Sequence, residues 1–383
     1  MLSFEFATAN RIIFGAGKLN ELGKHIEGNA KRILLVCGRS SDAIPRVREI
    51  LLGLDIAFTE FQVHGEPTID VVDAGIKAAG DCDMVVGLGG GSVLDTGKAV
   101  AALVTNPGEV SDYLEVIGKG QPLINRPLPY IAIPTTAGTG SEVTRNAVIE
   151  STEQNVKVSL RSPSMLPRVA LVDPELTYNL PPDITASAGL DALTQLIEPF
   201  VSVKANPMTD AICCEGIYHV AQSLRRAYEN GTDNKAREQM SLASLLGGLA
   251  LANAALGAVH GFAGPLGGML HAPHGALCAR LLPFVMEANI RALETRQPEH
   301  PALGRYFEIA QILTGEKEAT ALDGVKWTAE LVDILKIPGL SKYGISEGDF
   351  PEAVEKTMKA NSFKGNPIAL NEMELREILE KAL

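Results

Sequence analysis

The chain has 383 residues, enough for two or three domains, and its composition of 46% apolar, 21% charged and 5% aromatic residues excludes a disordered, collagen-like or disulfide-stapled protein. Its 34 basic and 46 acidic side chains give a net charge of −12. This charge excludes a general attraction for nucleic acid or for an anionic membrane surface, and favours a small-molecule enzyme or a protein-binding module.

Five cysteines, none in a CxxC pair, predict buried thiols in a reducing compartment. The N-terminal residues show no basic segment followed by an apolar one, so we expect no secretory signal and a cytoplasmic location. Residues 239–279 carry no charge and are long enough to cross a bilayer. They include several polar residues and an expected break at Gly264-Pro265, so a buried helix is the preferred interpretation and no membrane contact is expected.

Short apolar runs alternate with amphipathic stretches through the first 180 residues. The predicted strands are Arg32–Cys37, Ile56–Val63, Met84–Leu88, Tyr130–Ile133 and Val169–Val172. The predicted helices between them are Ala43–Leu52, Asp70–Ala79 and Val93–Val104. This alternation predicts an α/β domain, a parallel sheet with helices on both faces that binds ligands at the carboxyl ends of its strands.

After Pro181-Pro182 the strand pattern ends and helical periodicity dominates. The predicted helices are Asp183–Val201, Pro207–Asn230, Lys235–Ala258, Gly275–Glu294, Pro301–Leu313, Leu322–Leu335, Asp349–Ala360 and Leu370–Ala382. We therefore expect two domains, an α/β domain over residues 1–180 and an all-α domain over residues 181–383.

Two turns at predicted strand ends are suited to a nucleotide. The first contains Gly89, Gly90, Gly91 and Ser92 between a strand and a helix, where backbone N–H groups can approach a phosphate closely. A tight structural turn is the alternative, and the spacing is not the usual dinucleotide fingerprint. The second, residues 134–142, offers hydroxyl donors from three threonines and a serine. Together the two turns predict a ligand with an extended diphosphate.

A carboxylate, an amide and two imidazoles form a candidate metal site in the helical half. Asp191 and Gln195 project from one face of a predicted helix, and His260 and His274 lie in the uncharged segment. Such ligands suit a divalent first-row metal with a position open for substrate. Each histidine alone could instead be a satisfied buried side chain, but two buried imidazoles in this segment need partners.

Several motifs resemble the iron-containing (group III) alcohol dehydrogenase family, over nearly the whole chain and in the right order. They are FGAG, GGGSVLDTGKA, PTTAGTGSEVT, LVDPELT, AGLDALTQLIE and AVHGFAGPLGG followed by APHG. The resemblance implies a Rossmann-like N-terminal domain, a helical C-terminal domain of the dehydroquinate synthase-like type, and a cleft that holds NAD(P) and a metal.

The resemblance also implies residue roles. Gly89 to Ser92 match the pyrophosphate loop, with Asp95 behind it. The remaining nucleotide contacts implied are Thr135, Thr136, Thr139, Lys157 and Leu176. Asp191, His260 and His274 match three of the family's four metal ligands, and His274 is also carried over as a catalytic residue.

The chain departs from the family pattern at two positions. Gln195 replaces the usual second histidine ligand; its amide oxygen can coordinate, but less well than imidazole. Gly264 stands where many members have a histidine suited to proton transfer, so His271 becomes the candidate catalytic substitute, with an exposed loop histidine as the alternative.

In this family, the segment after the first predicted strand is expected to lie near the 2′-position of the cofactor, where NADP carries a phosphate and NAD does not. Gly38, Arg39 and Ser40 occupy the place where NAD-preferring members tend to carry an aspartate. An arginine can pair with a 2′-phosphate through two hydrogen bonds, so NADP is favoured over NAD, although Arg39 could equally be solvated.

The resulting hypothesis is a metal-dependent NAD(P) alcohol dehydrogenase that moves a hydride between an alcohol and the cofactor, with one Fe(II) or Zn(II) ion. By family expectation it is a homodimer. The alternatives are a metal-free oxo-acid reductase like maleylacetate reductase, a sugar-phosphate cyclising lyase of the same fold, and a non-catalytic nucleotide-binding protein.

Overall fold

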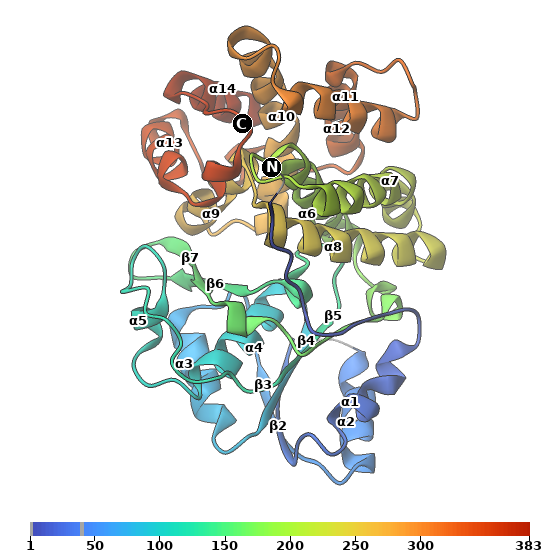
Figure 1. Cartoon of the computed structure of the whole chain (residues 1–383), viewed down its shortest axis with the longest axis vertical. Helices are drawn as coiled ribbons and strands as arrows, with labels where there is room; N and C mark the ends of the chain where they lie inside the picture. Colours follow the sequence, from blue (N-terminus) through green and yellow to red (C-terminus); the bar gives the residue numbers. More distant parts are fainter. Residues whose placement is uncertain (1–2, 39–41) are drawn as a thin grey trace. The chain divides into compact units, whose positions relative to one another are not determined.

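The computed structural model describes residues 3–38 and 42–383, so Arg39 and Ser40 lie outside the described residues. The chain forms two compact units (Figure 1). One comprises residues 7–179, here called the α/β unit, and the other residues 180–383, here called the helical unit. The described residues up to Phe6 group with the helical unit and not with the first domain, where they were predicted to belong.

A six-stranded parallel sheet forms the centre of the α/β unit, in the order β1-β8-β5-β4-β2-β3. Its strands are β1 (Ile12–Phe14), β2 (Arg32–Cys37), β3 (Ala57–Gln62), β4 (Met84–Gly89), β5 (Tyr130–Pro134) and β8 (Val169–Val172). All five predicted strands are present, and the prediction of a parallel sheet is confirmed. The strand order reverses between β2 and β4, and ligands of such sheets bind beyond the carboxyl ends of strands at this kind of reversal.

Both faces of the sheet are covered, because alternate strand residues enter two different apolar cores. Leu34 and Val36 of β2 belong to one core, together with Val100 of α4. Ile33 and Leu35 belong to the other. The helices of the unit are α1 (Leu22–Ile26), α2 (Ala43–Gly53), α3 (Ile69–Ala79), α4 (Gly91–Leu103) and α5 (Val110–Tyr113). Short 3₁₀ turns are η1 (Lys18–Glu21), η2 (Ser141–Val143), η3 (Pro163–Met165) and η4 (Pro174–Thr177).

One edge strand and one hairpin were not predicted. Strand β1 has three residues, too few to give a recognisable pattern. Strands β6 (Asn146–Ser151) and β7 (Val156–Arg161) pair antiparallel as a separate hairpin beside the main sheet. Their mixed polar and apolar residues give no continuous apolar run. The hairpin matters for the site because its first strand contacts α4.

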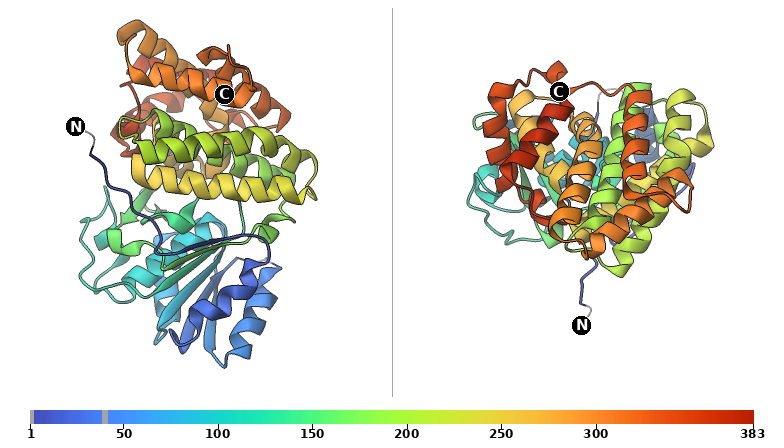
Figure 2. Two further views of the ribbon diagram at one scale, coloured as in Figure 1. Left: turned by 45° about the vertical axis from the view of Figure 1, so that its right-hand side comes forward. Right: turned by 90° about the horizontal axis from the view of Figure 1, so that it is seen from above.

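The helical unit contains nine α-helices among its described residues. They are α6 (Pro182–Val201), α7 (Pro207–Glu229), α8 (Asn234–Ala254), α9 (Ala258–Leu270), α10 (His274–Arg296), α11 (Pro301–Thr314), α12 (Ala321–Ile334), α13 (Phe350–Lys359) and α14 (Glu372–Ala382). Three 3₁₀ turns connect the later helices: η5 (Leu340–Tyr343), η6 (Glu347–Asp349) and η7 (Ser362–Gly365). Helices α6, α7 and α8 pack side by side, and α10 packs on both α6 and α9 (Figure 2). The prediction of an all-α second half is confirmed.

The uncharged segment is broken at a different place from the one predicted. Helix α8 ends at Ala254, Ala255 adopts a left-handed backbone with φ 62°, and α9 then runs through Gly264 and Pro265 without interruption. The bend is therefore at residues 255–257, because the start of α9 is held there by side chains: the Ala258 N–H donates to Asn366 Oδ1 at 3.1 Å. Within the described chain no single helix is long and apolar enough to cross a membrane. Among the described helices, α8 and α9 are long and apolar enough for a span only when taken together, and they are bent by 100° where they meet.

Candidate active site

Asp191 lies in the middle of α6 and is almost completely buried. Gln195, one helical turn later, donates from its Nε2 to Asp191 Oδ2 at 3.0 Å. The other carboxylate oxygen, Oδ1, faces two histidine rings, with His260 Nε2 at 3.5 Å and His274 Nε2 at 3.9 Å. Gln195 therefore binds Oδ2 of the carboxylate, and Oδ1 is the oxygen that faces the imidazoles.

His260 lies on the first turn of α9 and is oriented by a buried glutamate. Its Nδ1 is 2.7 Å from Glu198 Oε2, while Glu198 Oε1 accepts the Val259 N–H at 2.6 Å. A carboxylate on Nδ1 favours the tautomer that leaves Nε2 as a bare nitrogen, and Nε2 is the atom that faces Asp191. Glu198 belongs to α6, three residues beyond Gln195, so one helix supplies both Asp191 and the partner that orients His260.

His274 and Cys278 lie one turn apart at the start of α10 and therefore on the same helix face. The Cys278 Sγ is 3.6 Å from His274 Nε2. Between them, Gly275 allows α10 to approach α6 closely: a Cβ at this position would lie 2.8 Å from the Ser187 carbonyl oxygen and 3.5 Å from the Cβ of Asp191. A larger residue at 275 would separate the two helices where the four side chains meet.

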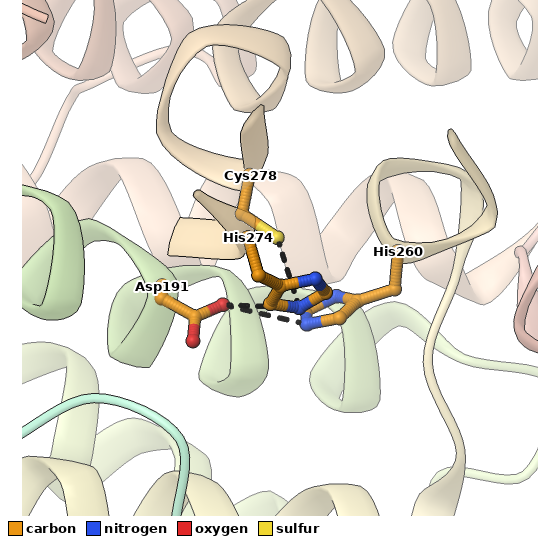
Figure 3. A group of neighbouring side chains, drawn as sticks. All are labelled: Asp191, His260, His274 and Cys278. Atoms are coloured by element: carbon orange, nitrogen blue, oxygen red, sulfur yellow. Dashed lines mark hydrogen bonds and ion pairs between the residues drawn. The ribbon is translucent and has the colours of Figure 1, made fainter. Parts of the chain in front are cut away.

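Asp191, His260, His274 and Cys278 form one cluster, here called the four-residue cluster (Figure 3). Each offers one ligand atom, and these atoms all lie within 4.8 Å of one another. Asp191, His260 and Cys278 are buried, whereas the His274 side chain is 35% exposed. Among the residues that the structure describes, Asp191 Oδ1 is a buried oxygen that accepts no hydrogen bond of normal length. A cation would satisfy that oxygen, so the donor set fits a divalent first-row metal.

The electrostatics of the cluster follow from burial and proximity. Burial alone would raise the pKa of Asp191, but contact with His260 and the nearby His274 outweigh it and hold the pKa below its usual value. Burial opposes protonation of His260, yet Cys278 and Asp191 raise the pKa of its imidazole well above the usual value. Burial raises the pKa of the Cys278 thiol to about 12. The buried carboxylate thus attracts positive charge, which a metal ion would supply in competition with protons.

The structure brings three predicted residues together, places Gln195 in contact with one of them and His271 apart, and adds a cysteine that was not predicted. Gln195 contacts Asp191 on the oxygen that faces away from the histidines. His271 ends α9 with an exposed side chain and is not a member of the four-residue cluster. At Gly264 a Cβ would meet no atom within 4 Å, so there is open space one turn from His260. Cys278 was missed, although its position four residues after His274 in a predicted helix was a usable signal.

The two nucleotide-candidate turns are adjacent in the α/β unit. They follow neighbouring strands, since Gly89 of β4 pairs with Pro134 of β5, and the Thr135 N–H donates to the Gly89 carbonyl at 3.0 Å. Gly90 is the N-cap of α4. A Cβ on Gly91 would lie 2.7 Å from Thr139 Cγ2, so the absence of a side chain lets the second turn pack directly on the first. The backbone N–H groups at the start of α4 suit a phosphate.

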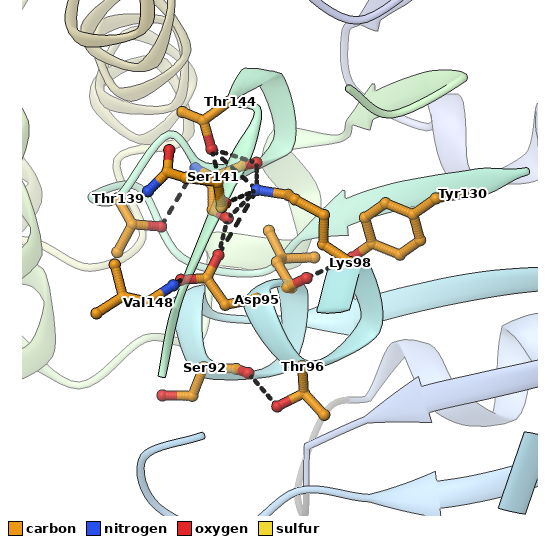
Figure 4. Close-up of polar contacts among 11 residues, drawn as sticks. Ser92, Asp95, Thr96, Lys98, Tyr130, Thr139, Ser141, Thr144 and Val148 are labelled. Carbon is orange, nitrogen blue, oxygen red and sulfur yellow. Dashed lines mark hydrogen bonds and ion pairs between the residues drawn. The ribbon is translucent and has the colours of Figure 1, made fainter. Parts of the chain in front are cut away.

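A buried lysine of α4, the helix that begins at the first turn, holds the end of the second turn (Figure 4). The Lys98 Nζ donates to the Ser141 carbonyl at 2.8 Å, Ser141 Oγ at 3.0 Å, Thr144 Oγ1 at 2.9 Å and the Asn146 carbonyl at 2.7 Å. Burial lowers the pKa of Lys98, which is 1% exposed. Asp95, one turn earlier on α4, accepts from Ser141 Oγ and, at 2.9 Å, from the Val148 N–H. Both oxygens of Asp95 thus accept hydrogen bonds that hold the second turn, and its contact with a nucleotide stays a prediction.

The remaining predicted nucleotide contacts are spread over the α/β unit. Gly38 follows β2 and donates its N–H to the Leu88 carbonyl at 3.4 Å. Lys157 of β7 pairs with Glu66 at 3.2 Å, and Leu176 packs on the sheet core from η4. The predicted hydroxyl contacts, all partly exposed, are Ser92, Thr135, Thr136 and Thr139.

Comparison with known proteins places both units in one family. The family model for iron-containing alcohol dehydrogenase matches residues 9–174 of the sequence. The family model for the C-terminal domain of Fe-containing alcohol dehydrogenases matches residues 185–383. Alcohol dehydrogenase 4 of Saccharomyces cerevisiae (strain YJM789) is 37% identical over 378 residues, covering 96% of each chain. 1,3-Propanediol dehydrogenase of Citrobacter freundii is 34% identical over 397 residues, covering 99% of this chain and 98% of the relative.

Solved structures agree. A crystal structure of 1,3-propanediol oxidoreductase matches with a TM-score of 0.90 at 34% identity, covering both chains fully. The sulfoacetaldehyde reductase of Bifidobacterium kashiwanohense, solved in complex with NAD+, matches with a TM-score of 0.87 at 28% identity, covering 100% of this chain and 99% of the other. Because these matches span nearly the whole chain, the protein is an oxidoreductase that belongs to the iron-containing alcohol dehydrogenase family.

Proposed function

We propose that this oxidoreductase transfers a hydride between a primary or secondary alcohol and a nicotinamide dinucleotide, and reduces the aldehyde or ketone in the reverse direction. The observation that carries this proposal is the four-residue cluster in the helical unit, with its buried, unsatisfied carboxylate oxygen. The paired glycine and threonine turns of the α/β unit supply the complementary requirement, a place for a diphosphate.

The chain's own residues have separate tasks in this reaction. Asp191, His260 and His274 would hold a divalent cation, which would supply a Lewis acid for the substrate oxygen. Glu198 keeps the Nε2 of His260 available for that cation. The turn around Gly90 would bind the diphosphate of a dinucleotide, whose nicotinamide would supply the hydride chemistry.

Several relatives support an alcohol–carbonyl reaction. Relatives that cover almost the whole chain are named alcohol dehydrogenase, 1,3-propanediol dehydrogenase and sulfoacetaldehyde reductase. Each of these names describes an enzyme that interconverts an alcohol and a carbonyl compound, but the substrates differ. The open space beside Gly264 leaves room for a substituent near His260.

The finer assignments belong to the same proposal. We infer Fe(II) or Zn(II) as the metal from the imidazole and carboxylate ligands. Arg39 and Ser40, which lie outside the described residues, carry the preference for NADP, while a solved relative binds NAD+. His271 remains the predicted proton-transfer residue and His274 a predicted catalytic residue, and the homodimer and the cytoplasmic location also stay predictions.

The test begins with metal content. Protein purified without chelators or a histidine tag is analysed for metal, stripped, reloaded with Fe(II) or Zn(II), and assayed against an alcohol panel with NAD and with NADP. We expect about one ion per chain, and turnover that is lost on stripping and in His260→Ala and His274→Ala. His219→Ala on α7, a histidine of the helical unit that is not a member of the four-residue cluster, is the control. Activity on oxo-acids without any metal would instead establish the metal-free reductase.

A further inference from the structure

We propose that Cys278 is a direct ligand of the metal ion, as a thiolate, alongside Asp191, His260 and His274. This inference rests on the proposed function, which requires a cation at the four-residue cluster. It extends that proposal by assigning a sulfur donor, and with it a preference among metals.

The position of Cys278 supports direct binding. Its sulfur points toward the His274 ring in Figure 3, and Sγ and Nε2 are 3.6 Å apart. Two ligands about 2.0 and 2.3 Å from one tetrahedral ion lie about this far from each other. The distances from Asp191 Oδ1 to His260 Nε2, 3.5 Å, and to His274 Nε2, 3.9 Å, fall in the same range. Three pairs of these atoms thus lie at the spacing of ligands on one ion, and all four atoms lie within 4.8 Å of one another.

Gln195 is placed differently. Its Nε2 donates to Asp191 Oδ2, the oxygen that faces away from the histidines. Its Oε1 lies against α8, where a Cβ on Gly247 would be 3.5 Å away. The amide thereby orients Asp191 from behind, and the thiol of Cys278 takes the fourth position.

A thiolate ligand changes the chemistry of the site. On binding, the S–H bond of Cys278 breaks, its proton passes to solvent, and the sulfur electron pair bonds the ion. Soft thiolate donors select Zn(II) over harder ions, so the sulfur should bias this site toward zinc. The buried location of Cys278, with no exposed sulfur, suits a ligand and does not suit a thiol that reacts with solutes.

Cobalt(II) provides a test that does not depend on turnover, because a thiolate bound to cobalt gives an intense near-ultraviolet charge-transfer band. Full-length metal-free protein is titrated with cobalt chloride, and bound cobalt is counted by elemental analysis. Cys278→Ser and Cys278→Ala are compared with the wild type, and Cys214→Ser on α7 is the control for an adventitious thiol. Circular dichroism verifies folding.

We expect the band in the wild type and in Cys214→Ser, and its loss in both Cys278 variants. The zinc affinity of these variants should fall about tenfold or more. Even mutation of a residue that only orients a metal ligand lowers metal affinity about tenfold to a hundredfold. A wild type that binds one cobalt per chain without the band, or a band that persists in the Cys278 variants, would overturn the inference and leave the proposed function standing. A wild type that binds neither cobalt, zinc nor Fe(II) would overturn both.

Discussion

Replacement of Glu198 by glutamine should weaken metal binding without removing a ligand. In the wild type both carboxylate oxygens accept, Oε2 from His260 Nδ1 at 2.7 Å and Oε1 from the Val259 N–H at 2.6 Å. An amide has only one accepting end. If its NH₂ group faces His260, the imidazole proton must move to Nε2, which blocks the nitrogen that faces Asp191. If the NH₂ group faces Val259, two donors oppose each other.

Either orientation has a similar cost. A buried donor left without an acceptor costs about 1–3 kcal/mol, and loss of the carboxylate that orients a metal-bound histidine reduces metal affinity about tenfold to a hundredfold. A factor of ten corresponds to about 1.4 kcal/mol, so the two arguments agree. Glu198 is only 4% exposed, so water does not readily replace the lost interaction.

The assay is competition between the protein and a chromophoric chelator for Zn(II). Glu215→Gln is the matched control, because Glu215 pairs with His219 at 3.1 Å on α7 but is 63% exposed and not part of the four-residue cluster. We expect the control to match the wild type and Glu198→Gln to bind zinc about tenfold to a hundredfold more weakly. Unchanged zinc affinity in a folded Glu198→Gln variant would refute the tautomer argument.

Three further predictions concern the α/β unit. Lys98→Met should lower the free energy of unfolding of this unit by about 3–5 kcal/mol in urea, because a buried cation with four acceptors is removed. The control Lys119→Met, at an exposed lysine, should change that free energy by less than about 0.5 kcal/mol. Equal effects of the two variants would contradict the reasoning. Gly91→Ala should lower the affinity for NAD about tenfold, measured by calorimetry, because its Cβ would lie 2.7 Å from Thr139 Cγ2 and would push the two turns apart. An affinity equal to that of the wild type would show that the turns need not stay in contact. Burial raises the pKa of Glu142 from 4.5 to about 7, so the folded state binds more protons between these values, and stability present at low pH is lost as pH rises through about 7. Glu142→Gln should remove this dependence, worth roughly 3 kcal/mol across that interval, and a variant with the same pH profile as the wild type would be inconsistent with it.

The α/β unit was predictable where its strands are buried on both faces. The runs Ile33–Cys37 and Val169–Val172 are apolar throughout because helices cover the sheet on each side, and the observed bounds of both strands agree with the predicted ones. Strand β1 and the β6–β7 hairpin have no comparable signal, since they are short or mixed in polarity. The bend after Ala254 was misplaced because the proline at 265 is a visible breaker, whereas the left-handed Ala255 is not.

The sequence by itself determined the kinds of ligand available, Asp191, His260 and His274, and the glycine turns at strand ends. Only the tertiary structure decided which atoms meet. Asp191 and His274 are 83 positions apart in the chain and come together because Gly275 permits close packing of α10 on α6. Whether Gln195 faces the histidines or lies behind Asp191 depends on that packing, and so does the entry of Cys278 into the cluster. Residue spacing fixes a helix face, but long-range packing sets which faces oppose one another.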